Sequence, residues 1–272
     1  MRAVRSSTPE GRAGLEALLA RPGRALLATD FDGTLSPIVA DPRDARAHPG
    51  AVPVLTRLAK VVGTLAVITG RPAPEAVAYG ELAAVPGLIV LGHYGWQRWQ
   101  DGELTGPAAP PAVQAAREAL PGVLRAAGAA DGTWIEDKAD ALVVHTRRTA
   151  DPEAALGVLR DPLDDLAARL GLAAQSGRMV IELRMPGMDK GIALTALARE
   201  RAADPVVFCG DDLGDLPAFA AVRALRAAGI QGCAVASANP ESPQVADAAD
   251  LVVDGPDGIV ALLAAIAADL GL

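Results

Sequence analysis

Short apolar runs alternate with amphipathic stretches over the first hundred residues. The apolar runs predict buried strands at 24–28, 63–68 and 88–91. Helical spacing predicts helices over 9–21, over 52–60 and from about residue 74. Strands that alternate with helices form βαβ units and therefore a mostly parallel sheet. Asp101 and Gly102 at the centre of residues 96–105 predict a hairpin after the third strand.

The pattern changes in the middle of the chain. Here each predicted helix is followed by two closely spaced strand-like runs, with the helices at 113–127 and 152–170 and the strands at 133–136, 141–145, 172–174 and 178–183. Strands this close cannot be joined by parallel crossovers, so an antiparallel sheet is expected. Gln175–Gly177 is interpreted as the turn of the second hairpin.

The first pattern returns in the last third of the chain. A helix is expected from Lys190 to about 201, followed by strands and helices at 205–209, 216–228, 231–236, 251–253 and from 259. We therefore predict an α/β core made of residues 1–107 and 186–272, with an α+β domain inserted at 108–185. Proline-rich residues 106–111 and Met185-Pro186-Gly187 are the expected hinges.

Polar residues follow the predicted parallel strands. Asp30 and Asp32 come after the first strand, Thr69 after the second, and Asp211 with Asp212 after a later one. The carboxyl ends of parallel strands share one edge of a sheet, which is where such sheets bind ligands. Two carboxylates side by side suit Mg2+, although Asp30 and Asp32 taken alone could equally be an acidic turn.

These residue types, together with Lys190 at a helix start, suit the transfer of a phosphoryl group. One carboxylate can attack phosphorus and form an aspartyl-phosphate. A second can give a proton to the leaving alcohol and take one from water. Mg2+, a hydroxyl group and a lysine can stabilise the phosphoryl oxygens as charge shifts.

Composition and net charge exclude some kinds of partner and location. The 272 residues carry a net charge of −8 without a Lys/Arg cluster, which argues against a nucleic-acid partner. A metal and a few local cations would still allow an acidic protein to bind a phosphate. No apolar run approaches the ~18 residues of a membrane span, and Met1–Ser7 lacks the apolar stretch of a secretory signal. Cys209 and Cys233 lie in apolar runs and are expected to be buried free thiols, which favours a cytoplasmic location.

The motifs D-F-D-G-T-L, T-G-R, the lysine-led helix and G-D-D-x-x-D together resemble the haloacid dehalogenase superfamily of phosphatases, with a Rossmann-like core. The resemblance implies that Asp30 is the nucleophile and Asp32 the general acid and base, and that Thr69 and Lys190 bind the phosphoryl group. It implies that Mg2+ is held by Asp30, the main-chain carbonyl of Asp32, and Asp211, with Asp212 as a further metal partner. The insertion resembles a cap domain of the C2 type.

Within the insertion and just after it, the sequence is similar to the trehalose-6-phosphate phosphatase family. The resemblance rests on Glu136-Asp137-Lys138, His145-Thr146-Arg147, Glu182-Leu183-Arg184 and Asp189-Lys190-Gly191. It implies that Glu136, Lys138, His145 and Glu182 bind the distal glucose, and Arg71 of the T-G-R motif is also expected to bind substrate. On pattern alone, Glu136 and Lys138 could be a solvated hairpin tip and His145 a core histidine.

Some positions depart from the family pattern. Gly92-His93-Tyr94-Gly95 stands where the family usually has G-N-H-G, and Gly214 and Leu216 replace the usual Thr and Glu around Asp215. The sequence assigns no role to His93 or Asp215. Trp96 and Trp99 could stack on a sugar, but packing over the hairpin is expected of them.

The combined prediction is a Mg2+-dependent phosphatase that hydrolyses trehalose 6-phosphate. Its rivals are a phosphatase of another sugar phosphate, such as glucosylglycerol or sucrose phosphate, a sugar phosphomutase, and a non-catalytic sugar-phosphate-binding regulator. The intact acids and lysine argue against the regulator. A functional pairing with a trehalose-6-phosphate synthase is a further option that no motif of the chain indicates.

Overall fold

The computed structural model divides the chain into two compact units, and it describes residues 6–39, 41–106, 110–138, 141–177, 179–240 and 242–272. Unit 1 consists of Met1–Thr105 and Asp189–Leu272, and unit 2 of Gly106–Met188. Among the helices of the described residues, none combines the length and the apolar character that crossing a membrane requires.

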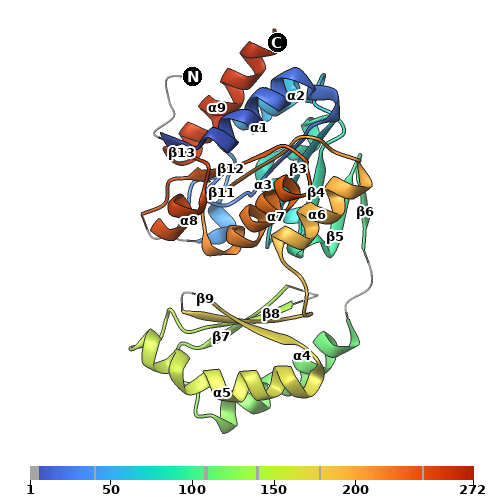
Figure 1. Cartoon of the computed structure of the whole chain (residues 1–272). Helices are drawn as coiled ribbons and strands as arrows, with labels where there is room; N and C mark the ends of the chain where they lie inside the picture. Colours follow the sequence, from blue (N-terminus) through green and yellow to red (C-terminus); the bar gives the residue numbers. More distant parts are fainter. Residues whose placement is uncertain (1–5, 40, 107–109, 139–140, 178, 241) are drawn as a thin grey trace. The chain divides into compact units, whose positions relative to one another are not determined.

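Unit 1 is built on a sheet whose strands, over the described residues, run in the order β1-β13-β12-β11-β2-β3-β4-β5-β6 (Figure 1). Their bounds are β1 (Ser6–Ser7), β2 (Leu26–Thr29), β3 (Thr64–Ile68), β4 (Ile89–Gly92), β5 (Gln97–Gln100), β6 (Glu103–Thr105), β11 (Val206–Gly210), β12 (Gly232–Ser237) and β13 (Leu251–Val253). The neighbours from β13 to β4 pair in parallel, whereas β1, β5 and β6 pair antiparallel at the two edges. The predicted mostly parallel sheet and the hairpin at Asp101-Gly102 are confirmed.

Helices cover both faces of this sheet because its strands are apolar on both sides. Leu27 points into one hydrophobic cluster and its neighbours Leu26 and Ala28 into another. The first cluster is completed by α1 (Pro9–Ala20), α2 (Ala51–Leu58), α3 (Ala73–Gly80) and α9 (Gly255–Asp269). The second is completed by α6 (Lys190–Glu200), α7 (Leu216–Ala227) and α8 (Pro243–Ala248). Cys209 and Cys233 are buried free thiols on β11 and β12, as expected.

Unit 2 is an antiparallel sheet with the order β7-β8-β10-β9 and two helices on one of its faces (Figure 1). Its elements are α4 (Pro111–Ala126), β7 (Trp134–Asp137), β8 (Ala141–His145), α5 (Pro152–Leu170), β9 (Ala173–Gly177) and β10 (Val180–Arg184). Leu142, Val144 and Ile181 pack under the helices. Because side chains alternate along a strand, Glu136, Val143 and Glu182, which oppose one another across β7, β8 and β10, belong to the other face.

One local prediction is wrong. Gln175–Gly177 is not the turn of the second hairpin but the end of β9, since Gly177 pairs with Val180 and Ser176 with Ile181. The polar composition suggested a turn, but pairing with the apolar strand β10 keeps these residues extended. Met179, with φ at +59°, lies in the connection that follows.

Candidate active site

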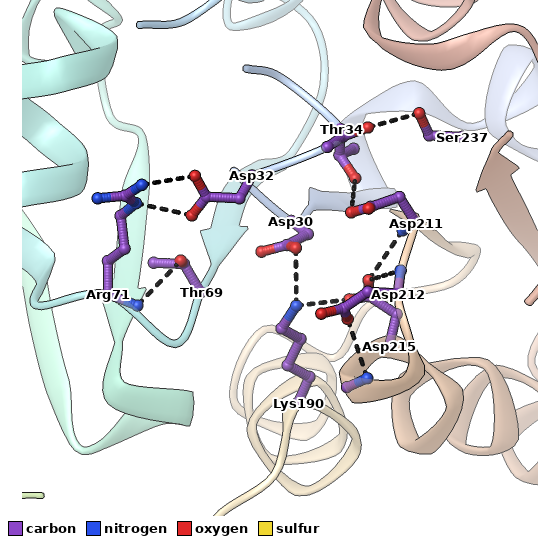
Figure 2. A network of polar contacts seen from close by, with 12 residues as sticks. Asp30, Asp32, Thr34, Thr69, Arg71, Lys190, Asp211, Asp212, Asp215 and Ser237 are labelled. Carbon is purple, nitrogen blue, oxygen red and sulfur yellow. Dashed lines mark hydrogen bonds and ion pairs between the residues drawn. The ribbon is translucent and has the colours of Figure 1, made fainter. Parts of the chain in front are cut away.

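The carboxyl ends of three neighbouring strands bring the predicted core residues together in unit 1 (Figure 2). Asp30 follows β2, Thr69 follows β3, and Asp211 follows β11. The amide of Asp30 donates to the carbonyl of Cys209 at 2.7 Å, which extends the β2–β11 pairing to the first acidic residue. The sequence therefore predicted the correct edge of the sheet for these side chains.

Lys190 lies between two buried carboxylates. Its Nζ is 2.8 Å from Oδ2 of Asp30 and 2.7 Å from Oδ1 of Asp215, and the lysine side chain is 4% exposed. Burial alone would lower the pKa of Lys190, but the carboxylates of Asp215 and Asp30 raise that pKa well above its ordinary value. The ammonium group is therefore a fixed positive charge beside Asp30.

The start of α6 places this lysine. Asp189 caps the helix, because its carboxylate accepts from the amide of Ile192 at 2.8 Å. Gly191 allows the helix to approach α7 closely, since a Cβ there would lie 2.3 Å from the carbonyl oxygen of Pro217. The combination of cap and glycine fixes the first turn of α6 and directs Lys190 toward β2.

Asp215 is a functional residue that the sequence reasoning missed. It is fully buried, and its Oδ2 accepts from the amides of Asp211 at 2.8 Å and Asp212 at 3.1 Å. Burial raises the pKa of Asp215 to about 6, in opposition to the attraction of Lys190. The third acid of G-D-D-x-x-D was a visible signal. Only the folded turn shows that this carboxylate connects the loop after β11 to Lys190.

Asp211 is held by groups from two other loops. Its Oδ1 accepts from the Thr34 hydroxyl at 3.3 Å and its Oδ2 from the Asn239 amide at 3.0 Å. Gly33 approaches it so closely that a Cβ would lie 2.0 Å from Oδ2, and Ser237 donates to the Gly33 carbonyl at 2.6 Å. Asn239 and Ser237, at the end of β12, were also missed. Their position after another parallel strand was the available signal.

Several carboxylates here could hold a metal ion. Asp30, Asp212 and Asp215 each place an oxygen within 4.8 Å of the others. Burial, with the nearby charges of Asp215 and Asp212, raises the pKa of Asp211 to about 8, and burial raises the pKa of Asp30 well above its usual range. Crowded hard oxygen donors that resist ionisation together fit a divalent cation such as Mg2+.

The composition of this group differs from the predicted metal set. Asp215 belongs to it although it was not predicted, and its oxygens also accept from Lys190 and from two amides. The predicted ligand Asp211 is not among the three acids grouped here within the described residues, and its oxygens accept from Thr34 and Asn239.

Asp32 turns away from this group and toward Arg71 (Figure 2). Its two oxygens accept from Nε and from a terminal nitrogen of Arg71, each at 2.6 Å. The amide of Arg71 in turn donates to the Thr69 hydroxyl at 3.1 Å. Arg71 therefore contacts two of the four residues predicted to be catalytic.

The predicted sugar-binding residues contact one another in two pairs in unit 2. His145 Nε2 is 2.9 Å from Glu136, and Lys138 Nζ is 3.2 Å from Glu182. The His145 ring stacks on Trp134 with 4.0 Å between ring centroids. The His145 side chain is 20% exposed, so a core histidine does not describe it, while the 39% exposed side chain of Glu136 is partly solvated.

Comparison with known proteins agrees with this geometry. The family model described as "Trehalose-phosphatase" matches residues 28–256. A trehalose-phosphate phosphatase of Mycobacterium marinum is 31% identical over 262 residues, which cover 89% of this chain and 61% of that protein. A trehalose-phosphate phosphatase of Mycobacterium avium is 32% identical over 249 residues, covering 84% and 58%. The chain thus spans about three fifths of the length of these relatives.

Solved structures share the fold. The C-terminal domain of a C. albicans trehalose-6-phosphate phosphatase superimposes with a TM-score of 0.77, covers 98% of this chain and 99% of that one, and is 22% identical. A haloacid dehalogenase-like hydrolase from Bacteroides thetaiotaomicron gives a TM-score of 0.57 at 16% identity. The predicted combination of a Rossmann-like core and an inserted antiparallel domain is confirmed.

Proposed function

Since the chain belongs to the trehalose-phosphatase family, we propose that it hydrolyses trehalose 6-phosphate to trehalose and phosphate. The observation that carries the proposal is Lys190, held between Asp30 and Asp215 beside the acids that follow β11. This arrangement offers a nucleophilic carboxylate, a positive charge and a cation site at one edge of the sheet. The names of the curated relatives supply the substrate.

Asp30 acts as the nucleophile. One of its carboxylate oxygens forms a bond to phosphorus while the bond from phosphorus to the sugar oxygen breaks, which leaves an aspartyl-phosphate. Asp32 gives a proton to the departing sugar oxygen. In the second step Asp32 takes a proton from water, the water oxygen bonds to phosphorus, and the bond to Asp30 breaks to release phosphate. Lys190 and the hydroxyl of Thr69 stabilise the phosphoryl oxygens in both steps.

The residues present fit a Mg2+ ion. It would be held by the carboxylates of Asp30, Asp211 and Asp212 and by the main-chain carbonyl of Asp32. When bound, Mg2+ would offset the negative charge of the acids and of the phosphate. Thr34 and Asn239 keep the Asp211 carboxylate oriented for this role.

Unit 2 supplies the groups for the sugar. Glu136, His145, Lys138 and Glu182 offer carboxylate acceptors and nitrogen donors, and dense hydrogen bonding of this kind recognises a polyol. Arg71 of unit 1 is the remaining predicted substrate contact. The buried free thiols support a cytoplasmic location. The proposal also includes a functional pairing with a trehalose-6-phosphate synthase, which co-purification of the two proteins would test.

A phosphate-release screen tests the proposed function. The purified protein is offered trehalose 6-phosphate, sucrose 6-phosphate, glucosylglycerol phosphate and glucose 6-phosphate, each with Mg2+ or with EDTA. We expect the highest kcat/KM for trehalose 6-phosphate and no turnover in EDTA. A preference for another sugar phosphate would overturn the substrate, and formation of a sugar bisphosphate would indicate a phosphomutase.

A further inference from the structure

The Asp32 side chain is partly exposed, yet its orientation is fixed by a neighbouring side chain. Its side chain is 41% exposed, whereas that of Arg71 is 12% exposed. Both carboxylate oxygens accept from the same guanidinium, at 2.6 Å each. A two-point contact between planar groups fixes direction as well as distance, which a single hydrogen bond does not. The orientation of the Asp32 carboxylate is therefore set by Arg71.

Arg71 is itself held at both its main chain and its side chain. Its amide donates to Thr69 and its carbonyl accepts from the amide of His93 at 2.9 Å, so the loop after β3 is fixed on two sides. Its guanidinium lies over the ring of Tyr79, 5.4 Å from the centroid, and near that of Phe31, at 5.7 Å. A guanidinium within about 6 Å of the centroid of an aromatic ring is attracted to the face of that ring.

Tyr79 is the part of this support that lies outside the core next to the acids. Phe31 is fully buried beside Asp30 and Asp32, so its position follows from the core. Tyr79 comes from α3, packs at the edge of the same cluster, and carries a second guanidinium, that of Arg46, 5.2 Å from its ring centroid. Its ring thus joins a helix that carries no predicted catalytic residue to the arginine that holds Asp32.

We infer that Tyr79 and Arg71 are positioning residues for Asp32, which rests on the proposed role of Asp32 as general acid and base. A general acid must lie within hydrogen-bond reach of the leaving oxygen, and small displacements of reacting groups reduce rates steeply. Attraction to the Tyr79 ring holds the Arg71 guanidinium in place, and that guanidinium orients the Asp32 carboxylate. Neither residue changes its covalent bonds during the reaction.

The leaving group provides the test. A sugar alkoxide needs a proton from Asp32, whereas p-nitrophenolate is a weak base that departs without one. Tyr79→Leu removes the ring and keeps an apolar side chain of suitable size, while the matched variant Tyr79→Phe keeps the ring. With saturating Mg2+ and enzyme in saturating excess, we expect Tyr79→Leu to slow release of trehalose in a single turnover about tenfold and release of p-nitrophenolate less than about twofold. The single turnover isolates the first step, because the later hydrolysis of the aspartyl-phosphate is common to both substrates. Tyr79→Phe should restore the wild-type ratio of the two rate constants.

Two results would overturn the inference. Equal losses of the single-turnover rate on both substrates would mean a general structural effect, and unchanged rates on both would mean that the Tyr79 ring does not support Asp32. If Tyr79→Leu does not fold, Arg71→Lys keeps the charge and removes the two-point contact, and the same selective loss is expected. Saturating enzyme keeps a weakened substrate contact of Arg71 out of this rate. If the wild-type protein hydrolyses p-nitrophenyl phosphate but not trehalose 6-phosphate, the proposed substrate is wrong. The ratio of single-turnover rates is then measured with glucose 6-phosphate or whichever alkyl phosphate the screen shows to be hydrolysed.

Discussion

Replacing Lys190 by methionine would remove the positive charge that lies between two buried acids. Asp30 is 4% exposed and Asp215 is fully buried, and each has an oxygen within 2.8 Å of Nζ. Removal of one partner from a buried ion pair leaves an uncompensated charge and costs about 3–5 kcal/mol. We therefore expect Lys190→Met to lower the free energy of unfolding by about 3–5 kcal/mol at pH 8 without Mg2+. Phosphatase activity should disappear at the same time.

The pH dependence of this loss follows from the carboxyl groups. The pKa of Asp215, about 6, lies above its ordinary value. Ionising this carboxyl in the folded protein therefore lowers the free energy of unfolding, and the loss grows as the pH rises toward 6. The ammonium limits this cost in the wild-type protein but not in the variant. The pKa of Lys190 is raised further from neutrality, so the lysine itself stays charged at pH 5–8. The difference in stability between the two proteins should accordingly shrink as the pH falls from 8 to 5.

Guanidinium chloride unfolding followed by circular dichroism measures both quantities. Lys60→Met is the matched control, because Lys60 is exposed in unit 1 and its loss should change stability by less than about 0.5 kcal/mol. A Lys190→Met protein within about 1 kcal/mol of wild type at pH 8 would refute the reasoning. A stability difference that does not vary with pH would refute the role given to the buried acids.

Three further predictions concern the metal, the proton transfer and the sugar. The pKa of Asp211 is about 8, so this carboxyl is mostly protonated at pH 6.5. Calorimetric titration should therefore show weaker Mg2+ binding at pH 6.5 than at pH 8.5, with release of protons on binding. A Kd for Mg2+ that does not vary with pH would contradict this. In single turnovers at saturating enzyme, Asp32→Asn should slow release of trehalose roughly 10²–10⁴-fold and release of p-nitrophenolate far less, and equal losses would remove Asp32 as general acid. Glu182→Ala should raise KM for trehalose 6-phosphate far more than KM for p-nitrophenyl phosphate, and equal increases would exclude Glu182 from the sugar site.

The local sequence pattern was sufficient to predict which edge of the sheet carries the acidic residues. Asp30, Thr69 and Asp211 each follow a short apolar run directly, and parallel pairing then brings them together without any further information. The helix that begins at Lys190 could be predicted for the same reason, since its cap and glycine are neighbours in the chain.

The roles that the sequence did not reveal depend on contacts distant in the chain. Asn239 was not predicted, and it donates to Asp211, 28 positions away. Arg71 was predicted to bind substrate, but its contact with Asp32, 39 positions away, was not predicted. No periodicity or composition signals such contacts, because they depend on which loops the sheet order brings together. Asp215 was visible as an acid, but its role depends on a turn in which it accepts from the amides before it. Gln175–Gly177 was misassigned because pairing with β10 outweighed its turn-like composition.

The central claim is that Asp30 carries the phosphoryl group during turnover. The direct measurement is to mix the protein with trehalose 6-phosphate and Mg2+, quench the reaction in acid during turnover, and locate the phosphoryl group by peptide mass spectrometry. We predict one phosphoryl group on the peptide that contains Asp30, on Asp30 itself, with none on this peptide and no phosphate release in an Asp30→Asn variant. Phosphate release by Asp30→Asn at more than a few per cent of the wild-type rate, or a phosphoryl group on another residue, would contradict the account.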